Sequence, residues 1–558
     1  MKDKKIEKFV EVFLCFILAC IALFSYFKGD ISVLPSQDLT YHINRFIGLS
    51  KAFENGQILP KIYPYSNNSF GYGAPLFYCD LFLYPFAILY HFGLSAVLCF
   101  KFCVLFYTFL VNLFVYFILK KETNNKFISF VGMILYLTCN YHLQNVLIRS
   151  ALGEVLALTY IPLVLHSIYK ILIKHEDSFI YLGVSFSLLV MCHLISSLLY
   201  GLFFFVMIVI FIILNRKDKE LIYRVIKTIM KGTIIALLLC AWYLVPMFEQ
   251  LHSQTFWLSI NAKYNNISSG IQSILDIFNV FAYSDTYTVG LPLIVLGFSS
   301  FFIKNNKYIK IIVLYCIFVY LILLGVIPGQ YLNIIQFYFR LNVVLFPLLT
   351  ICSIYTLLNF DKKIYICSIV LIFSLVNVIK TNIDLIHDDK YSLDNNADEY
   401  EVNHVTNFLY DLDYNHDELG GAEYLPYTEY LNYLDDSWAI KCRDENGEVV
   451  DYIYEYDRNF LTITFDCNND KDIELLLPLS WYKGYNAYEF VDGKWEKIDC
   501  SYDLVFKEVL IIGRSGSHTY MVTYKGTALQ NISLIISFSS LIILVICSTL
   551  KKKKIVNV

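Results

Sequence analysis

Three polar side chains in the segment 38–54 have the types and spacing for acid–base chemistry on a phosphate ester. If this segment is a helix, Asp38, His42 and Arg45 lie on one face, at spacings of four and three residues. A carboxylate there can take a proton from a hydroxyl group, and a guanidinium can bind phosphate through its planar fork. The alternative is that Asp38 caps the N-terminus of a solvated helix.

Two further arginines are predicted at the outer ends of apolar runs, where the phosphate of a lipid lies. Arg149 is followed closely by Glu154, and Arg340 opens a later apolar run. Arginine is suited to a phosphate leaving group because two parallel N–H donors match two phosphate oxygens. The alternative for each arginine is a side chain that reaches lipid headgroups or pairs with a carboxylate, as Arg149 would with Glu154.

Three other ionisable residues have two interpretations each. His193 lies inside an apolar run, where an ionisable group is either functional or a hydrogen-bonded histidine near the rim of the membrane. Glu249 is either a second acid of the site or a solvated side chain. Asp80 has the same ambiguity.

The composition requires a membrane. Hydrophobic residues make up 57% of the 558 residues and charged residues only 16%, which is outside the range of soluble globular domains. A strongly basic patch of the kind that binds nucleic acid is not evident. Most of the 15 cysteines lie in apolar runs, where they behave as small hydrophobic residues, and no structural disulfide is predicted.

The apolar runs predict about twelve membrane-spanning helices. They lie near residues 9–27, 95–119, 127–145, 155–173, 179–196, 198–214, 230–248, 287–303, 309–327, 336–358, 363–380 and 529–549.

The positions of lysine and arginine set the predicted orientation. If the segment 76–91 does not cross, all connections rich in these residues fall on one side, which the positive-inside rule assigns to the cytoplasm. Both termini are then cytoplasmic, in a multi-pass protein of the cell membrane. The segment 76–91 becomes a helix at the outer interface that Pro85 breaks.

Two large extracytoplasmic pieces remain: the first outer loop, 28–94, and the polar region 381–527. The second contains short alternating runs typical of a small β-sandwich. Its aromatic residues either stack on sugars or form a core: Trp481, Tyr482 and Tyr485. The predicted domains are a transmembrane domain, 1–380, a β-rich domain, 381–527, and a last span with a basic tail, 528–558.

An ordered set of motifs suggests a family. After Asp38 come Gly56-Gln-Ile-Leu-Pro60 and Gly71-Tyr-Gly-Ala-Pro75, then Arg149-Ser-Ala-Leu-Gly-Glu154, Gln336-Phe-Tyr-Phe-Arg340 and Pro478-Leu-Ser-Trp-Tyr-Lys-Gly484. The set resembles membrane glycosyltransferases of the GT-C fold. It is more closely similar to the bacterial membrane family whose domain is called "6-pyruvoyl-tetrahydropterin synthase-related", a label that implies no pterin chemistry.

The resemblance implies an extracytoplasmic enzyme that moves a sugar from a polyprenyl-phosphate carrier to a cell-surface polymer or glycolipid. It places Asp38 at the reaction centre, with His42, Arg45, Arg149, Glu154 and Arg340 as substrate-binding residues. No cofactor is implied. Many GT-C members have a second acidic residue beside the first, but here the neighbour is Gln37, which weakens the inference of a metal site. Dependence on a divalent metal is left open.

Two other functions compete with the transferase. A flippase or transporter of lipid-linked saccharides would have buried charges near the middle of the membrane and paired broken helices. A non-catalytic scaffold would use its β-rich domain to bind wall polymer. The chain has no Walker-type glycine-rich loop, so energy must arrive with the substrate or from an ion gradient.

Overall fold

The computed structural model describes residues 2–27, 38–67, 69–264, 272–282, 286–303, 306–327, 335–387, 423–428 and 438–556. Gln37 and the first part of the predicted β-rich domain, 388–422, lie outside these ranges. The chain forms two compact units. Unit 1 comprises Met1–Ile43, Leu94–Leu237 and Asn265–Asp398, and unit 2 comprises Asn44–Gly93, Leu238–Tyr264 and Glu399–Val558.

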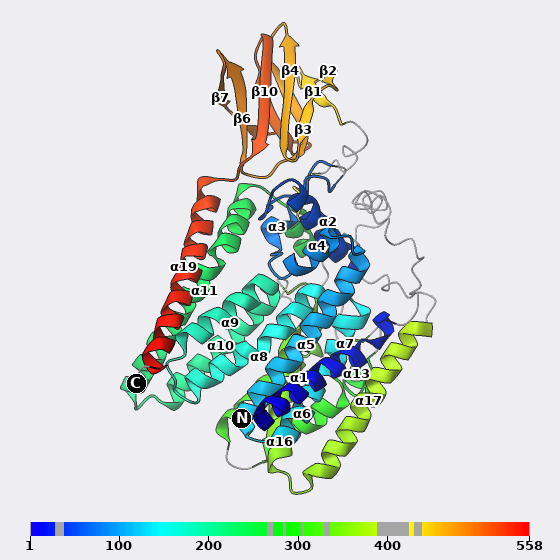
Figure 1. Ribbon diagram of the computed structural model, residues 1–558, viewed down its shortest axis with the longest axis vertical. Helices are drawn as coiled ribbons and strands as arrows, with labels where there is room; N and C mark the ends of the chain where they lie inside the picture. Colours follow the sequence, from blue (N-terminus) through cyan, green and yellow to red (C-terminus); the bar gives the residue numbers. More distant parts are fainter. Residues whose placement is uncertain are drawn as a thin grey trace. The chain divides into compact units, whose positions relative to one another are not determined.

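Unit 1 is helical (Figure 1). Its elements are α1 (Lys2–Ala22), η1 (Phe24–Phe27), α5 (Ala96–Thr123), α6 (Lys126–Leu137), α7 (Asn140–Leu143), η2 (Gln144–Ile148), α8 (Leu152–Leu172), α9 (Phe179–Cys192), α10 (Leu194–Leu214), α13 (Ile274–Ile277), α14 (Leu291–Ser299), η3 (Ser300–Phe302), α15 (Lys307–Leu323), η5 (Tyr338–Leu341), α16 (Asn342–Asn359) and α17 (Lys363–His387). Two helices, α2 (Leu39–Glu54) and α11 (Lys219–Ser253), run from one unit into the other.

Each of the predicted apolar runs overlaps with one or more helices. Within the described ranges, seven helices are long and apolar enough to cross a membrane: α5, α8, α10, α11, η5 with α16, α17 and α19 (Ala528–Val556). The apolar helices α6, α9 and α14 with η3 are shorter. The protein is thus mostly helical, with seven candidate membrane spans.

Glycines allow the central helices of unit 1 to approach closely. A Cβ added at Gly132 in α6 would lie 2.3 Å from Ile354 Cδ1 in α16, and one at Gly297 in α14 would lie 2.7 Å from Leu349 Cδ2. Larger side chains would separate these backbones, as at other close helix contacts in membranes. The result is a core in which α8 and α16 are buried on almost all sides.

The segment 76–91 holds two short helices, α3 (Ala74–Phe77) and α4 (Tyr84–His91). At eight residues α4 is too short to span a bilayer. The prediction that Pro85 breaks a helix was wrong, because Pro85 lies in the first turn of α4. A proline fits there because the first amide groups of a helix have no intrahelical acceptor.

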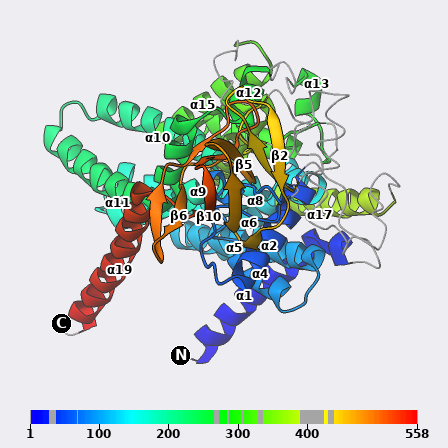
Figure 2. The same cartoon turned by 90° about the horizontal axis from the view of Figure 1, so that it is seen from above.

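The described part of unit 2 contains two antiparallel sheets of five strands each, with the orders β2-β1-β5-β9-β8 and β3-β4-β10-β6-β7. Figure 2 shows β2 and β5 of one sheet and β6 and β10 of the other. The strands are β1 (Ile440–Arg443), β2 (Val449–Ile453), β3 (Asp457–Asn459), β4 (Thr462–Asn469), β5 (Ile473–Ser480), β6 (Tyr485–Val491), β7 (Lys494–Ile498), β8 (Ser501–Tyr502), β9 (Glu508–Gly513) and β10 (Gly516–Tyr524). The β-rich character predicted from the alternating runs is confirmed.

Trp481, Tyr482 and Tyr485 are core residues. Their side chains are at most 8% exposed, so the interpretation as a sugar-stacking surface does not apply in this structure. Tyr482 also packs against Gly73 so closely that a Cβ on that glycine would lie 2.3 Å from a ring carbon. A larger residue at position 73 would displace this ring.

The outer loop 44–93 and the β-sheets belong to the same unit, which the sequence did not reveal. Ser480 N donates to Phe70 O at 2.7 Å, joining the end of β5 to the loop. Arg458 Nη2 donates to Pro64 O at 2.9 Å and to Ser69 O at 2.5 Å. These backbone acceptors tie the loop to the β-domain without requiring particular loop side chains.

Glu249 connects the end of α11 with the start of α19. Its Oε2 accepts hydrogen bonds from Thr527 Oγ1 at 2.8 Å and Gln530 Nε2 at 3.0 Å. Further along, Ser537 Oγ accepts from Trp242 N at 3.0 Å, so the two helices run side by side (Figure 1). The Glu249 carboxylate thus has a structural role: it binds the start of α19. Neither of its two predicted interpretations, a second acid or a solvated side chain, fits these contacts.

Candidate functional site

A buried ion network in unit 1 joins two arginines to one glutamate. Glu154 Oε1 accepts from Arg149 Nη1 and from Arg340 Nε, each at 3.2 Å. The side chains of Arg149 and Glu154 are 3% exposed and that of Arg340 is 12% exposed. Because one carboxylate faces two guanidinium groups, the network has a net positive charge that a nearby anion can neutralise.

Two neighbours complete the network. Tyr141 donates its hydroxyl to the second oxygen of Glu154 at 2.5 Å, and Arg149 Nη1 also donates to Asn145 Oδ1 at 2.5 Å. Both oxygens of Glu154 are therefore engaged. A buried charge that is fully hydrogen-bonded in this way keeps a fixed position, since every alternative position would lose hydrogen bonds.

Arg149 follows a local distortion of the backbone. The preceding segment, η2, is a π-helix, and Arg149 N donates to Gln144 O at 2.8 Å. The next residue, Ser150, has a φ of +52°, in the left-handed region that is unfavourable for residues with a side chain. π-Helical turns and strained backbones are concentrated at functional sites, because they aim side chains that a regular helix would direct elsewhere.

Arg340 lies in the 3₁₀ turn η5, directly before α16. Its Nη1 donates to Ile335 O at 3.2 Å and to the side chain of Gln336, a residue with a φ of +64°. With Nε bound to Glu154, the hydrogen bonds of this side chain to the described residues use Nε and Nη1. Its Nη2 thus remains a donor for a ligand.

Aromatic rings cover the guanidinium groups. Arg149 lies 4.8 Å from the ring centre of Phe339 and 5.5 Å from that of Tyr287. Arg340 lies 5.2 Å from the ring centre of Phe337, which stacks on Phe339. Aromatic faces attract cations. A charge interaction in such surroundings is stronger than in water.

Asp38 lies beside this network, immediately before α2. Its backbone N donates to Arg149 O at 3.3 Å, and His42 N donates to Asp38 O at 3.1 Å. Burial raises the pKa of the Asp38 carboxyl, and the charges of Arg149 and Arg340 oppose this shift while Glu154 adds to it. A carboxylate with a raised pKa is a better general base than an exposed one. The structure therefore brings Asp38, Arg149, Glu154 and Arg340 together.

Arg45 has a different partner. In unit 2 its Nε and Nη2 donate to Asp80 Oδ1 at 2.8 and 2.7 Å, and Nη2 donates to Cys79 O at 2.9 Å. Tyr63 donates to the other oxygen of Asp80. Arg45 and Asp80 are 1% and 5% exposed, so this is a buried structural ion pair. Asp80, and not a phosphate, binds this guanidinium. The two residues are 35 positions apart, so no local pattern in the sequence could indicate the pair.

His42 and His193 are both in unit 1. The side chain of His42 is buried at 2% exposure in the first half of α2, and its role in binding substrate stays a prediction. His193 caps α10: its Nδ1 accepts from Ser196 N at 3.3 Å and lies 2.8 Å from Ser196 Oγ. Of its two interpretations, the hydrogen-bonded histidine is the one that the contacts favour.

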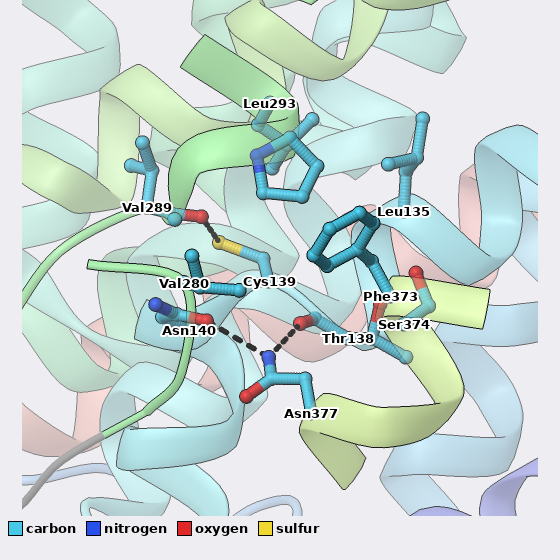
Figure 3. A pocket seen from close by; sticks show the side chains of 12 residues that line it. Leu135, Thr138, Cys139, Asn140, Val280, Val289, Leu293, Phe373, Ser374 and Asn377 are labelled. Atoms are coloured by element: carbon cyan, nitrogen blue, oxygen red, sulfur yellow. Dashed lines mark hydrogen bonds between the residues drawn. The ribbon is translucent and has the colours of Figure 1, made fainter. Parts of the chain in front are cut away.

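A small cavity of about 20 Å³ lies elsewhere in unit 1 (Figure 3). Its polar lining is already hydrogen-bonded: Asn377 Nδ2 donates to Thr138 O at 3.0 Å and to Asn140 Oδ1 at 2.8 Å, and Cys139 Sγ donates to Val289 O at 3.2 Å. The space suits a single water molecule and is far too small for a sugar. It is a packing feature of the helices.

Sequence reasoning missed Tyr141, Asn145 and the π-helix. One signal was present: the polar run Asn140-Tyr-His-Leu-Gln-Asn145 interrupts the predicted apolar span 127–145. A polar run of this kind is costly in a membrane unless its side chains face protein partners. The polar run therefore indicates a segment whose side chains form hydrogen bonds with other parts of the chain.

The helices, the candidate spans and the buried charges define an integral membrane protein with a C-terminal β-sheet domain. More specifically, the chain belongs to the family described as 6-pyruvoyl-tetrahydropterin synthase related domain, a membrane protein family, whose profile matches residues 74–384. The predicted resemblance to this family is confirmed, whereas the resemblance to GT-C glycosyltransferases stays a prediction. The match includes Arg149, Glu154 and Arg340, whereas Asp38 and the β-strands lie outside it.

A relative in Lactococcus lactis subsp. cremoris (strain MG1363), an uncharacterised protein, is 23% identical over 250 residues. The aligned residues make up 43% of this chain and 40% of the relative. The chain thus aligns with less than half of the relative's length.

Proposed function

We propose that the protein is a membrane glycosyltransferase of the GT-C type, with about twelve spans and both termini in the cytoplasm. It takes a sugar from a polyprenyl-phosphate carrier and transfers it to a cell-surface polymer or glycolipid outside the membrane. The substrates bring the energy for the reaction in the sugar–phosphate bond.

One observation carries this proposal: a carboxyl with a raised pKa, Asp38, lies beside two arginines, of which Arg340 retains a donor for a ligand. Sugar transfer from a phosphate needs a base for the acceptor and a cation for the leaving group. The base and the cation must act on the same substrate molecule, so they must lie close together, as Asp38 and Arg340 do.

The proposed reaction is a displacement at the anomeric carbon of the donor sugar. The acceptor oxygen forms a bond to this carbon while the bond from the carbon to the phosphate oxygen breaks. Asp38 takes the proton of the acceptor hydroxyl. The lipid phosphate leaves with the electron pair, and the guanidinium of Arg340 stabilises its growing charge.

Glu154 is assigned a positioning role in place of direct substrate binding, because both of its oxygens are occupied by protein donors. Without its charge, Arg149 and Arg340 would repel each other. With it, the two guanidinium groups are held close together, and Arg340 keeps its Nη2 donor for the phosphate.

The positions of these charges support an enzyme over a transporter. Glu154 is in the first turn of α8, and Arg340 is in the 3₁₀ turn that precedes α16. Both are therefore at the ends of candidate spans and not at their middle, where a transporter would hold its coupling groups.

The decisive experiment compares surface glycans by mass spectrometry. A strain without this protein is complemented with the wild type, with Asp38→Asn or with Asp384→Asn, a control in which an exposed carboxylate is replaced. All proteins are brought to equal abundance in the membrane. We expect a sugar to be missing in the deletion strain, restored by the wild type and the control, and still missing with Asp38→Asn. Unchanged glycans in the deletion strain, or restoration by Asp38→Asn, would overturn the proposal.

A further inference from the structure

Two cysteines face each other between the sheets of the β-domain. Cys442 is in β1 of one sheet and Cys467 is in β4 of the other. Both side chains point inward: Cys442 is 1% exposed and Cys467 is 5% exposed, and the other buried residues of β4, Ile463 and Phe465, alternate in step with Cys467. The pair therefore bridges the interior of the domain at one point.

The two thiols lie close enough to influence each other's ionisation. The thiols of Cys442 and Cys467 interact with each other, and Asn469 Nδ2 donates to Cys467 Sγ at 2.9 Å. The interaction between the two thiols lowers the pKa of Cys467 and raises the pKa of Cys442. Cys467 is thus the thiol that ionises more readily, and the thiolate is the reactive form of cysteine.

We propose that Cys442 and Cys467 are a modification site, where oxidation forms a disulfide that links the two sheets. The inference rests on the extracytoplasmic placement of the β-domain in the proposed function, because disulfides persist in oxidising compartments. The structure holds the reduced form, in which both thiols are free.

The oxidation needs an external acceptor for two electrons, which we assign to the disulfide of a thiol–disulfide oxidoreductase. The Cys467 thiolate attacks that disulfide and forms a mixed disulfide. The Cys442 sulfur, after losing its proton, attacks Cys467, so that the Cys442–Cys467 bond forms and the oxidoreductase leaves as a dithiol. Because both thiols are buried, the exchange takes place while the domain folds.

The bond would close a loop that contains β2 and β3. Closing such a loop removes conformations from the unfolded chain and so stabilises the folded domain. It would also connect the two sheets covalently, through β1 and β4. Cys500, the other cysteine of the described β-domain, belongs to neither strand and stays a thiol.

The test uses the full-length protein, expressed in cells and inserted into their membrane. Acid is added at harvest to stop thiol–disulfide exchange. The protein is denatured, alkylated without reductant, digested and analysed by mass spectrometry. We expect a peptide pair linked through Cys442 and Cys467, and alkylated Cys500 as the internal control. After reduction, both linked cysteines should become alkylated.

Recovery of Cys442 and Cys467 as alkylated thiols without reductant would overturn the proposal. A Glu445→Cys variant, labelled from outside in intact cells, reports separately whether the domain is extracytoplasmic, since Glu445 is exposed. If Glu445→Cys is labelled and no bridge is found, the disulfide fails while the topology stands. If the bridge forms, the double variant Cys442→Ser, Cys467→Ser should have a lower thermal midpoint than Cys500→Ser.

Discussion

Arg340 reaches Glu154 from 186 positions further along the chain, and its Nε donates to Glu154 Oε1 at 3.2 Å. This contact joins the start of α16 to the start of α8. It brings a second guanidinium beside the one that Arg149 already supplies. The site is therefore assembled by the tertiary structure, from segments that are far apart in the sequence and share no sequence motif.

The first prediction concerns this shared carboxylate. Glu154→Gln keeps the size of the side chain. It removes the negative charge that offsets the repulsion between two buried guanidinium groups. Because an unpaired charge remains in the interior, we expect a loss of about 3–5 kcal/mol of stability. The thermal midpoint in detergent should fall clearly. Glu176→Gln, which changes an exposed carboxylate, is the control and should leave the midpoint almost unchanged. An equally stable Glu154→Gln protein would contradict the network.

The second prediction separates two arginines that looked alike in the sequence. Arg340→Ala should raise the apparent Kd for a polyprenyl-phosphate donor while the protein still inserts into the membrane. Arg340→Lys should restore affinity only in part, since lysine lacks the planar fork. Arg45→Ala should instead destabilise the protein, because it leaves Asp80 buried without its partner. Donor binding and thermal midpoints, measured on all three variants, check the assignment. Full donor affinity in Arg340→Ala would remove that residue from the site.

The third prediction is topological. Single cysteines at Gln57 and Glu445 should react with a membrane-impermeant maleimide in intact cells. Cysteines at Lys121 and Asp218 should react only after the membrane is opened. The unmodified protein is the control, because it has 15 cysteines of its own, among them the exposed Cys547. Labelling of Lys121→Cys from outside would overturn the interfacial assignment of the segment 76–91, and it would reverse the sides assigned to the following helices.

Local patterns in the sequence predicted the local parts of the structure. The helix expected over 38–54 is α2, Leu39–Glu54, and the alternating run Phe460–Phe465 leads into β4. The contact of Arg149 with Glu154 was one of the alternatives, because these residues are only five positions apart. Periodicity and short spacing act over a few residues, so they are visible in a single sequence.

The parts that were not predicted depend on contacts between distant segments. Nothing near Arg45 indicated Asp80 as its partner, and nothing near Glu154 indicated Arg340. The π-helix before Arg149 follows from packing and not from a helical propensity, so it leaves no periodic signal. The predicted domain boundary at residue 380 also lies inside α17, because that helix continues to His387.

The last prediction concerns Asp38, on which the proposed mechanism depends. Asp38→Asn should leave expression, insertion and donor binding almost unchanged but lower the rate of transfer by about two orders of magnitude or more, the usual contribution of a positioned general base. Asparagine can still cap a helix, so a capping role would survive the change. Added Mn²⁺ or a chelator distinguishes a base from a metal ligand, because a base needs neither.

The pH profile of the wild type tests the same role of Asp38 independently. A base must be ionised to accept a proton, and burial raises the pKa of Asp38 above its ordinary value of 3.8. Transfer should therefore decline as the pH falls, and the decline should begin at a higher pH than an exposed aspartate would give. The residual activity of Asp38→Asn should lack this acid limb, whereas Asp384→Asn should keep it. A fully active, purified Asp38→Asn enzyme would return Asp38 to the role of a helix cap, and the two arginines would then need another base.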